Sequence, residues 1–90
     1  MLNTYLSEAL GSFVFFLIIL ATGNPIMIAV GLLIGILIAQ LTSQAHLNPA
    51  VTGMMLMTGK VNQTQAMWYV SAQLVGAIAA VYWWNHMKKN

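Results

Sequence analysis

The sequence predicts an all-α membrane protein with three transmembrane helices and one shorter helix that enters the membrane without crossing it. Of its 90 residues, 60% are hydrophobic and only 4% are charged, whereas soluble domains carry about 25% charged residues. Long apolar runs alternate with short polar or turn-forming segments, and one run is only about half a bilayer long. Because so few charges could not keep a water-exposed surface hydrated, we expect an integral, multi-pass protein of the cell or plasma membrane.

The composition also excludes several classes of function. The chain has no Cys, so a disulfide or a thiolate metal site is impossible. Its net charge of +2 is too small to indicate a nucleic-acid partner. The sequence contains no Ser/His/acid set, paired carboxylates or phosphate-binding glycine loop, and a lone His is not a metal site. We therefore expect no enzyme activity and no cofactor.

The first transmembrane helix is predicted over residues 5–22. At 1.5 Å per residue it spans roughly 27 Å, close to the ~30 Å hydrocarbon core. The N-terminus is not expected to be a signal peptide, because it lacks a basic start and Glu8 interrupts the early apolar run. The helix ends at Gly23, where Asn24 can cap the next helix and Pro25 can begin it.

The second transmembrane helix is predicted over residues 26–41 and is short, at roughly 24 Å. Polarity then rises through residues 40–46, which indicates a loop. After the loop, Asn48 and Pro49 repeat the same helix-start signal.

The helix that follows, predicted over residues 49–58, is too short to cross a membrane. About ten residues make roughly 15 Å of helix, half a bilayer, and Gly59-Lys60 ends the apolar run. Irregular backbone at membrane depth is tolerated only where protein buries it or where it lines a water-filled cavity. The segment is therefore interpreted as a re-entrant half-helix, which points to a pore or a substrate path.

The third transmembrane helix is predicted over residues 63–84, roughly 33 Å long, with Asn62 as its cap. Its end is typical of a membrane interface, with aromatic residues followed by basic ones in the headgroup region: Tyr82, Trp83, Trp84, then His86, Lys88 and Lys89. We expect residues 1–90 to form a single membrane domain.

Small residues recur at intervals of four in all three predicted spans, a pattern that lets membrane helices approach closely. The residues are Ser7 and Gly11 in the first span, Gly31, Gly35 and Ala39 in the second, and Ala72, Gly76 and Ala80 in the third.

Three blocks of sequence resemble the aquaporin, or major intrinsic protein (MIP), family. Residues 7–12 read S-E-A-L-G-S, similar to the family's A-E-F-L-G-T. Residues 43–52 read S-Q-A-H-L-N-P-A-V-T, similar to S-G-A-H-x-N-P-A-V-T, and residues 72–77 read A-Q-L-V-G-A, similar to A-Q-L-x-G-A. The blocks occur in the family's order, and the resemblance covers essentially the whole chain. It implies a passive channel for water or small neutral solutes.

The resemblance also has clear departures. A family member has six spans and two half-helices arranged as two inverted repeats, so this chain would supply half of the aquaporin fold. Gln44 replaces a usual Gly. The sequence contains no Arg among its basic residues, whereas water-selective members place an Arg directly after the second Asn-Pro-Ala. The position after this chain's Asn-Pro-Ala is Val51.

A single repeat could complete a pore if a second copy inserts upside down. Related repeats of this kind are arranged about an axis in the membrane plane. Three spans place the N-terminus and Lys60 on one side and Lys88 and Lys89 on the other, so the charge bias hardly fixes an orientation. We expect an antiparallel homodimer with dual topology, surrounded by membrane lipid. Because family members form tetramers of pores, the resemblance implies four dimers, an octamer.

The motif Asn48-Pro49-Ala50 would then meet its copy at the membrane midplane. The side-chain oxygen of Asn48 can accept from the backbone N–H of Ala50 or Val51, which leaves its amide N–H groups for a passing oxygen. Each half-helix N-terminus carries about +0.5 charge. Two facing ends would repel cations, as in aquaporin-type pores.

The family resemblance assigns roles to the surrounding residues. The carbonyls of Gln44, Ala45 and His46, extended by Leu47, would form an acceptor ladder for permeating molecules. Glu8 would anchor the loop by holding its N–H groups, since an acidic residue in a membrane helix is functional by default; the alternative is an interface residue near the start of its helix. His46 is interpreted as structural or pore-flanking.

The selectivity filter is expected to be apolar, formed by the residues Val51, Ala45, Ile28 and Ile36. Without the Arg, we expect a pore less strict for water and more open to small neutral solutes such as glycerol, urea or ammonia.

Three other interpretations remain open. The chain could be a small dual-topology multidrug exporter that uses Glu8 to bind protons and cationic drugs, although it lacks a fourth full span. It could be a half-channel subunit whose different partner supplies the Arg. It could also be a fragment or decayed half-gene. The aromatic residues that end the last span and the lysines that follow argue against this, since they are typical of a membrane interface.

Overall fold

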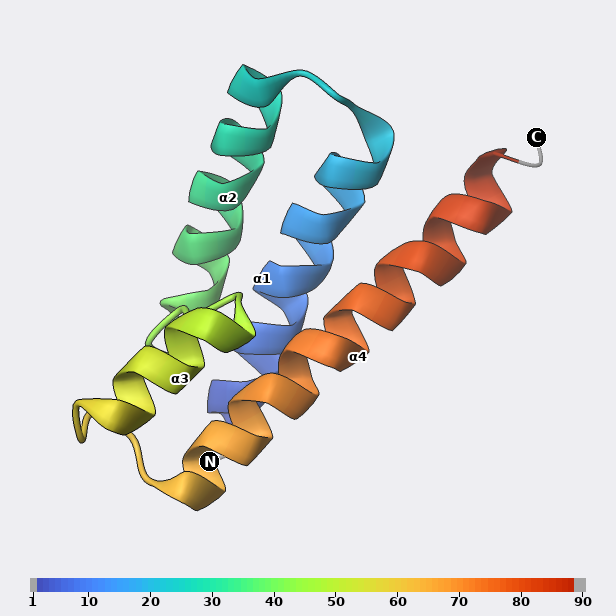
Figure 1. Ribbon diagram of the computed structural model, residues 1–90. Coiled ribbons are helices and arrows are strands. Elements are labelled where there is room, and N and C mark those ends of the chain that lie inside the picture. The colour runs from blue at the N-terminus through green and yellow to red at the C-terminus, as the bar shows by residue number, and fades with distance from the viewer. Residues whose placement is uncertain (1, 89–90) are drawn as a thin grey trace.

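The computed structural model describes residues 2–88, which fold into helices joined by short connections (Figure 1). The helices are α1 (Leu2–Ala21), α2 (Pro25–Ala39), α3 (Pro49–Met57) and α4 (Gln63–Lys88). No strand occurs among the described residues. The all-α fold class, with long spans and one short helix, is confirmed. Lys89, expected in the headgroup region, lies outside the described residues.

Asn24, Asn48 and Asn62 cap the three helices that follow them. The Asn24 side-chain oxygen accepts from the backbone N–H of Ile26 at 2.9 Å, and Pro25 is the first residue of α2. Asn62 and Gln65 form a reciprocal capping box at the start of α4, with distances of 2.8 and 2.9 Å. Each cap satisfies a backbone donor that has no partner within its own helix.

The helix ends differ from the sequence prediction by a few residues. Helix α1 begins at Leu2 rather than residue 5, and α4 continues to Lys88 rather than ending at residue 84. Both extensions are mostly polar, and the predicted limits followed the apolar residues. Helical hydrogen bonding continues past those limits because no Pro or Gly interrupts it. Helix α2 ends at Ala39, two residues early, because the chain turns at Gln40.

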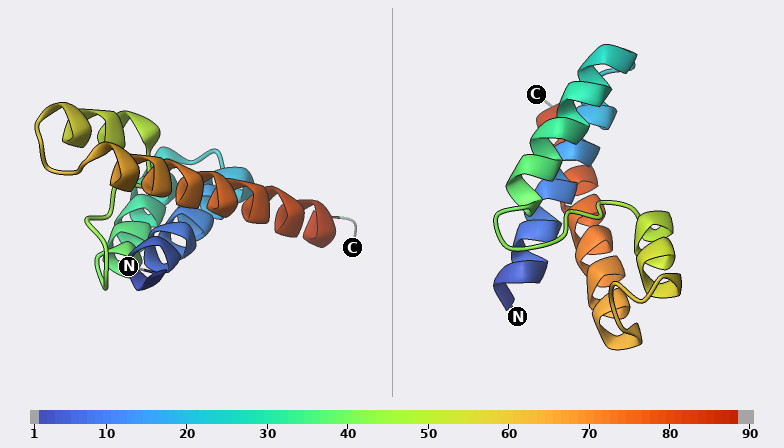
Figure 2. Two further views of the ribbon diagram at one scale, coloured as in Figure 1. Left: turned by 90° about the horizontal axis from the view of Figure 1, so that it is seen from below. Right: turned by 90° about the vertical axis from the view of Figure 1, so that its left-hand side faces the viewer.

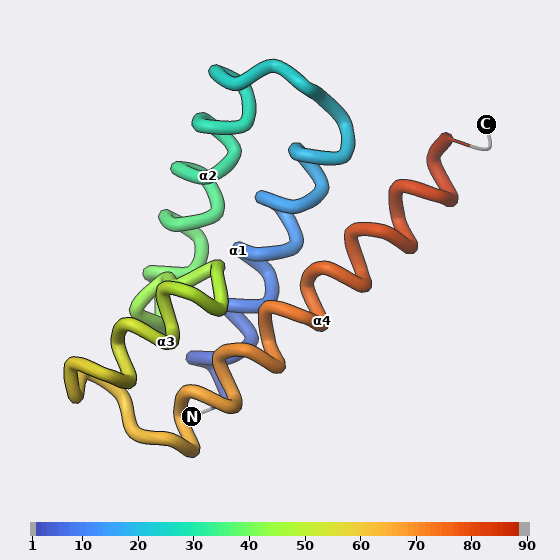
Figure 3. Tube along the Cα trace, viewed as in Figure 1, coloured from blue at the N-terminus to red at the C-terminus, as the bar shows by residue number. Residues whose placement is uncertain are grey.

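The helices are arranged with α1 against both α2 and α4, and α3 against the outer side of α4. Both views in Figure 2 show α4 lying between α3 and the α1–α2 pair. The tube in Figure 3 shows residues 40–48 returning from the end of α2 to the middle of the bundle, where α3 begins. The long axis of the molecule is 44 Å, comparable with the ~40–45 Å thickness of a bilayer including its headgroups.

Glycines bring the backbones of the spans into direct contact. A Cβ on Gly11 would lie 2.4 Å from the Gly35 carbonyl oxygen, and one on Gly76 would lie 2.7 Å from the Ala9 carbonyl oxygen. A Cβ on Gly31 would meet the Ile18 side chain at 2.8 Å. The structure thus places the regularly spaced small residues at the α1–α2 and α1–α4 interfaces.

The burial pattern differs from that of a soluble protein, because polar side chains are buried while many large apolar ones are exposed. The fully or nearly fully buried polar side chains are Glu8, Ser12, His46, Thr52 and Gln73. Large apolar side chains face outward on all four helices, for example Leu37 at 57% and Ile78 at 69% exposure. An apolar exterior this extensive requires lipid or protein around it. Helices α1 and α4 are long and apolar enough to cross a membrane, whereas α2 is apolar but has only 15 residues.

Candidate functional site

Glu8 lies at the centre of a buried polar site between α1, α4 and the loop of residues 40–48. Its side chain is 0% exposed. It accepts from the backbone N–H groups of His46, at 3.1 Å, and Leu47. The Gln73 amide also donates to it at 3.1 Å, and the Ser43 hydroxyl lies 3.1 Å away. All these partners can donate, so the ionised carboxylate, which only accepts, fits this environment.

The other N–H groups of the loop are also held by side chains. The Gln44 N–H donates to the Tyr69 hydroxyl at 3.0 Å, and the Ala45 N–H donates to Ser43 Oγ at 2.9 Å. Together with Glu8, these contacts satisfy the four consecutive backbone N–H groups of residues 44–47. Two of the acceptors, Glu8 and Tyr69, are distant in sequence, and the third, Ser43, belongs to the loop.

The loop backbone is strained at two positions. Ala45 has φ 57° and Leu47 has φ 58°, in the left-handed region that costs a residue with a Cβ about 1–2 kcal/mol. The side-chain anchors offset this cost and keep the N–H groups directed into the protein. Among residues 2–88, no hydrogen bond is made to the carbonyl oxygens of residues 44–47. The loop therefore has a row of backbone acceptors without partners in the described part of the chain.

A chain of side-chain hydrogen bonds ties α3 to this site. Gln73 Nε2 donates to Thr52 Oγ1 at 3.0 Å, Thr52 Oγ1 lies 2.8 Å from His46 Nδ1, and His46 Nε2 lies 3.0 Å from Gln44 Oε1. Because Gln44 Oε1 can only accept, the proton lies on His46 Nε2, and Nδ1 of the neutral imidazole then accepts from the Thr52 hydroxyl. The His46 ring also stacks on Tyr69, with centroids 3.9 Å apart.

Sequence reasoning did not identify Gln73, Thr52 and Tyr69 as site residues. Gln73 carried a usable signal, since it is a polar residue in the middle of an apolar span and such residues are usually functional. Thr52 and Tyr69 carried none, because Thr in a helix and Tyr in a membrane helix have many other uses.

Asn48 occupies the open end of the loop at the start of α3. Its side-chain oxygen accepts from the Ala50 N–H at 2.7 Å, which confirms the predicted cap. Asn48, Pro49 and Ala50 are all exposed. The Asn48 amide nitrogen makes no hydrogen bond within residues 2–88. A donor therefore follows directly after the row of free carbonyls.

The residues predicted to form a filter are not brought together within one chain. Val51 and Ala45 are half-buried near the site, in the first turn of α3 and in the loop. Ile28 and Ile36 are also half-buried but belong to α2, which does not pack against α3. These two lie about 12 Å apart along their helix axis, hence at different membrane depths. A filter at Val51 stays a prediction.

The whole sequence matches the family model for "Major intrinsic protein", over residues 1–90. Aquaporin-5 of Rattus norvegicus is 45% identical over 69 residues, which cover 71% of this chain and 26% of that protein. The glycerol uptake facilitator protein-like 6 of Lactiplantibacillus plantarum is 34% identical over 90 residues, covering 88% of this chain and 41% of that protein. Aquaporin-2 of Orycteropus afer is 47% identical over 62 residues, covering 67% and 57%.

No solved structure shows significant similarity to the chain. The chain spans between about a quarter and two fifths of the length of the rat and bacterial relatives. The family match nevertheless extends over every residue, and the fold has the apolar exterior that a bilayer requires. The chain belongs to the major intrinsic protein family and is an integral membrane protein.

Proposed function

We propose that this chain forms half of a passive membrane channel for water or small neutral solutes such as glycerol, urea or ammonia. A second, inverted copy would complete the pore, with the two α3 N-termini meeting at the membrane midplane. The observation that carries the proposal is the loop of residues 44–47, in which the four backbone N–H groups are held by side chains while the four carbonyl oxygens and the neighbouring Asn48 side-chain amide nitrogen have no hydrogen-bond partner within residues 2–88.

Such a loop suits a neutral permeant that both donates and accepts hydrogen bonds. Water or an alcohol could donate to the carbonyls of residues 44–47 and then accept from Asn48. The N-terminus of α3 adds about +0.5 charge at the same place. A permeating cation would meet this charge after losing its water, so cations would be excluded.

One chain provides only one wall of this path. Helix α3 packs on α4 and leaves the side towards α2 uncovered, and the exposed Asn48 needs a facing partner to enclose a pore. The relatives are longer than this chain, so their additional length could hold the equivalent second half. Here an inverted copy could supply the second half. Three spans would place Lys60 on one side of the membrane and Lys88 and Lys89 on the other, and this small charge difference hardly fixes one orientation. Four such dimers would make the octamer that the family resemblance implies.

The exporter alternative is less consistent with this site. An exporter would need Glu8 to exchange protons and cationic substrates, but its carboxylate is fully buried and already accepts from the loop and from Gln73. A half-channel subunit with a different partner fits the same geometry as the homodimer, so only the partner's identity separates them.

The channel proposal can be tested by comparing two matched substitutions in proteoliposomes. In stopped-flow measurements, we expect Asn48→Asp to reduce water and glycerol flux about tenfold or more, because Asp can still cap α3 but cannot donate. Asn24→Asp changes an equivalent helix cap in the exposed α1–α2 turn and should leave the flux unchanged. Equal flux in both variants would contradict the pore.

Blocking the path gives a second comparison. Val51→Trp should abolish flux, whereas Met57→Trp, which adds the same bulk at an 83% exposed position of α3, should not. The homodimer can be tested separately, since the chain has no native Cys. A thiol crosslinker should join two Ala50→Cys chains and not two Met57→Cys chains. Flux without the Ala50 crosslink would favour a different partner.

A further inference from the structure

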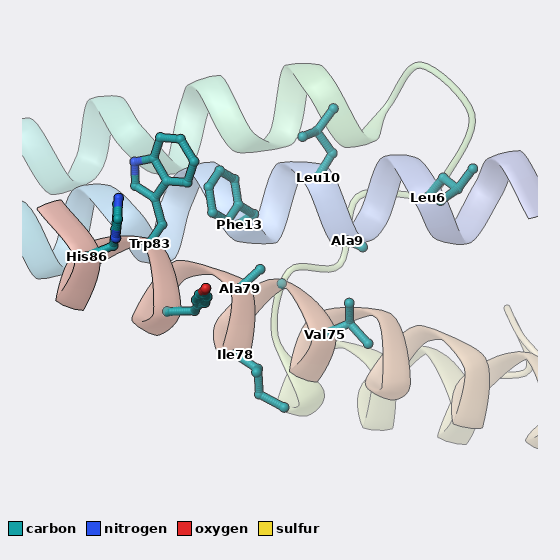
Figure 4. Close-up of a pocket in the computed structure, with 11 residues that line it drawn as sticks. Leu6, Ala9, Leu10, Phe13, Val75, Ile78, Ala79, Trp83 and His86 are labelled. Atoms are coloured by element: carbon teal, nitrogen blue, oxygen red, sulfur yellow. The ribbon is translucent and has the colours of Figure 1, made fainter.

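Two pockets border the α1–α4 pair, and they differ in chemistry. The larger, of about 990 Å³, is mostly apolar, with Leu10 and Phe13 of α1 and Val75 of α4 in its lining (Figure 4). The smaller, of about 400 Å³, has no charged residue in its lining, and most of the side chains there carry a hydroxyl or an amide group. This smaller, polar pocket suits a neutral solute that forms hydrogen bonds.

Gln44 belongs both to the lining of the polar pocket and to the row of carbonyl acceptors at residues 44–47. It is the first residue of that row, and it is exposed. The positive φ angles of the loop are at Ala45 and Leu47, so the Gln that stands here in place of the family's usual Gly adds a side chain without backbone strain. A solute that reaches the row from the polar pocket therefore meets the Gln44 side chain first.

The Gln44 side chain covers one nitrogen of the His46 ring. Its Oε1 lies 3.0 Å from His46 Nε2, and His46 is only 4% exposed although Gln44 itself is exposed. Thr52 contacts the other ring nitrogen, and one face of the ring stacks on Tyr69. Removing the Gln44 side chain would therefore uncover His46 at Nε2, while the other two contacts hold the ring in place.

The same contact decides which nitrogen of His46 carries the proton. Thr52 Oγ1 fits either neutral form, because it can donate to Nδ1, or accept from an Nδ1–H while donating to the Asn48 carbonyl oxygen, 3.4 Å away. Gln44 Oε1 can only accept, so it selects the form with the proton on Nε2. The donor that His46 could offer to a solute is thus the one that Gln44 occupies.

We propose that Gln44 is a specificity-determining residue, whose side chain covers His46 Nε2–H and narrows the path where the row of carbonyls begins. Without this side chain the path would be wider there, and a rigidly held N–H would be open to solutes. Both changes favour a polyol over water, because a polyol is larger and can use several hydroxyls at once. The role in selectivity rests on the proposed channel, whereas the hydrogen bond to His46 does not.

Nitrogen NMR of the histidine ring tests the Gln44 contact without any measurement of flux. The chain has two His residues, so His86→Gln, at an exposed position near the end of α4, leaves His46 as the single ring to be labelled. In proteoliposomes we expect Nε2 to be protonated and Nδ1 to be unprotonated.

A matched pair of substitutions completes the NMR test. Gln44→Met keeps the length of the side chain but has no amide oxygen, so it should move the proton towards Nδ1, where Thr52 can accept it. The control is Gln40→Met, four positions earlier, at an exposed residue whose side chain makes no hydrogen bond within residues 2–88. It should leave the Nε2–H form unchanged.

Stopped-flow measurements then test the effect on selectivity. Gln44→Ala should raise the ratio of glycerol flux to water flux severalfold, because it removes the side chain without giving the loop the backbone freedom of a glycine. Gln44→Met keeps the bulk over His46 and should leave the ratio nearly unchanged. Gln40→Ala removes a glutamine side chain from the same loop, and it should also preserve the ratio.

The outcomes separate a failure of this inference from a failure of the channel. An Nδ1–H ring in the protein with Gln44, or a ring that Gln44→Met leaves unchanged, would overturn the contact whether or not the protein conducts. Absence of flux in the unsubstituted protein would overturn the channel and with it the role in selectivity, but not the hydrogen bond. In a protein that conducts, an unchanged flux ratio in Gln44→Ala would overturn the role in selectivity alone.

Discussion

The two Asn-Pro helix starts share a local sequence signal but have different surroundings. Asn24 and Asn48 both cap a helix whose first residue is Pro. The turn at Asn24 is held only locally, because the Asn24 N–H donates to Thr22 Oγ1, two residues earlier, at 3.0 Å. The backbone before Asn48 is held by Glu8, 38 and 39 residues earlier in the sequence.

This difference shows what converts a helix start into a candidate site. A cap satisfies the first donors of a helix wherever it occurs. Before Asn48, distant side chains hold the N–H groups of Gln44, His46 and Leu47, and the nearby Ser43 holds that of Ala45. The Asn24 turn is held locally, whereas the Asn48 loop is also constrained by distant parts of the fold.

The largest effect is expected from removing the distant anchor. Glu8→Ala leaves the N–H groups of His46 and Leu47 without acceptors, each at a cost of about 1–3 kcal/mol. We expect a loss of about 3–5 kcal/mol in the free energy of unfolding, measured by titration of mixed micelles with dodecyl sulfate. The matched change at the other start, Thr22→Ala, removes an acceptor from an exposed turn and should cost less than about 1 kcal/mol. Similar losses in both variants would remove the distinction between the two starts.

The next largest effect concerns the helix contact that places Glu8 beside the loop. Gly11→Ala introduces a Cβ 2.4 Å from the Gly35 carbonyl oxygen, and such overpacking costs about 1–3 kcal/mol. Gly23→Ala, in the turn before Asn24, meets nothing within 4 Å and should change stability by less than about 1 kcal/mol. The same titration measures both variants. A neutral Gly11→Ala would mean that the α1–α2 contact tolerates separation.

A smaller effect is expected where the two starts are alike. Asn48→Ala and Asn24→Ala should each cost about 1 kcal/mol, because each removes one helix cap. Flux through proteoliposomes should nevertheless fall only for Asn48→Ala. Loss of flux in both variants would indicate that flux reports stability rather than the Asn48 side chain.

An effect of similar, small size is expected at the Tyr69 anchor of the loop. Tyr69→Phe removes the acceptor for the Gln44 N–H while keeping the ring that stacks on His46. We expect a cost of about 0.5–1.5 kcal/mol, with a larger proportional fall in flux because Gln44 begins the row of carbonyls. Tyr82→Phe, on the exposed side of the same helix, is the control and should change neither quantity.

Much of the fold could be predicted from local sequence. The Asn-Pro pairs located the starts of α2 and α3, and Asn62 located the start of α4, because capping depends on neighbouring residues alone. The ends of α1 and α4 were less predictable, since apolar character marks the membrane core and not the limits of helical hydrogen bonding. The spaced glycines indicated close packing, but not which helices would meet.

Less of the candidate site could be predicted. Glu8 was identified because a carboxylate in a membrane helix is costly, but its partner Gln73 and the link through Thr52 to His46 were not. These contacts join residues up to 65 positions apart, and no local pattern encodes them. The filter stays a prediction, because Val51 and Ile36 lie on helices that do not pack together within one chain.

By itself, the sequence determined the all-α membrane class and the start of the capped helices. Composition reports the lipid environment residue by residue, and capping depends on only a few neighbouring residues. The tertiary structure alone decided which Asn-Pro start became a site. Glu8, Tyr69 and Gln73 reach the loop only after α1 and α4 have packed on one another. The strained backbone at Ala45 and Leu47 persists because those buried partners hold it, and no local preference would select it.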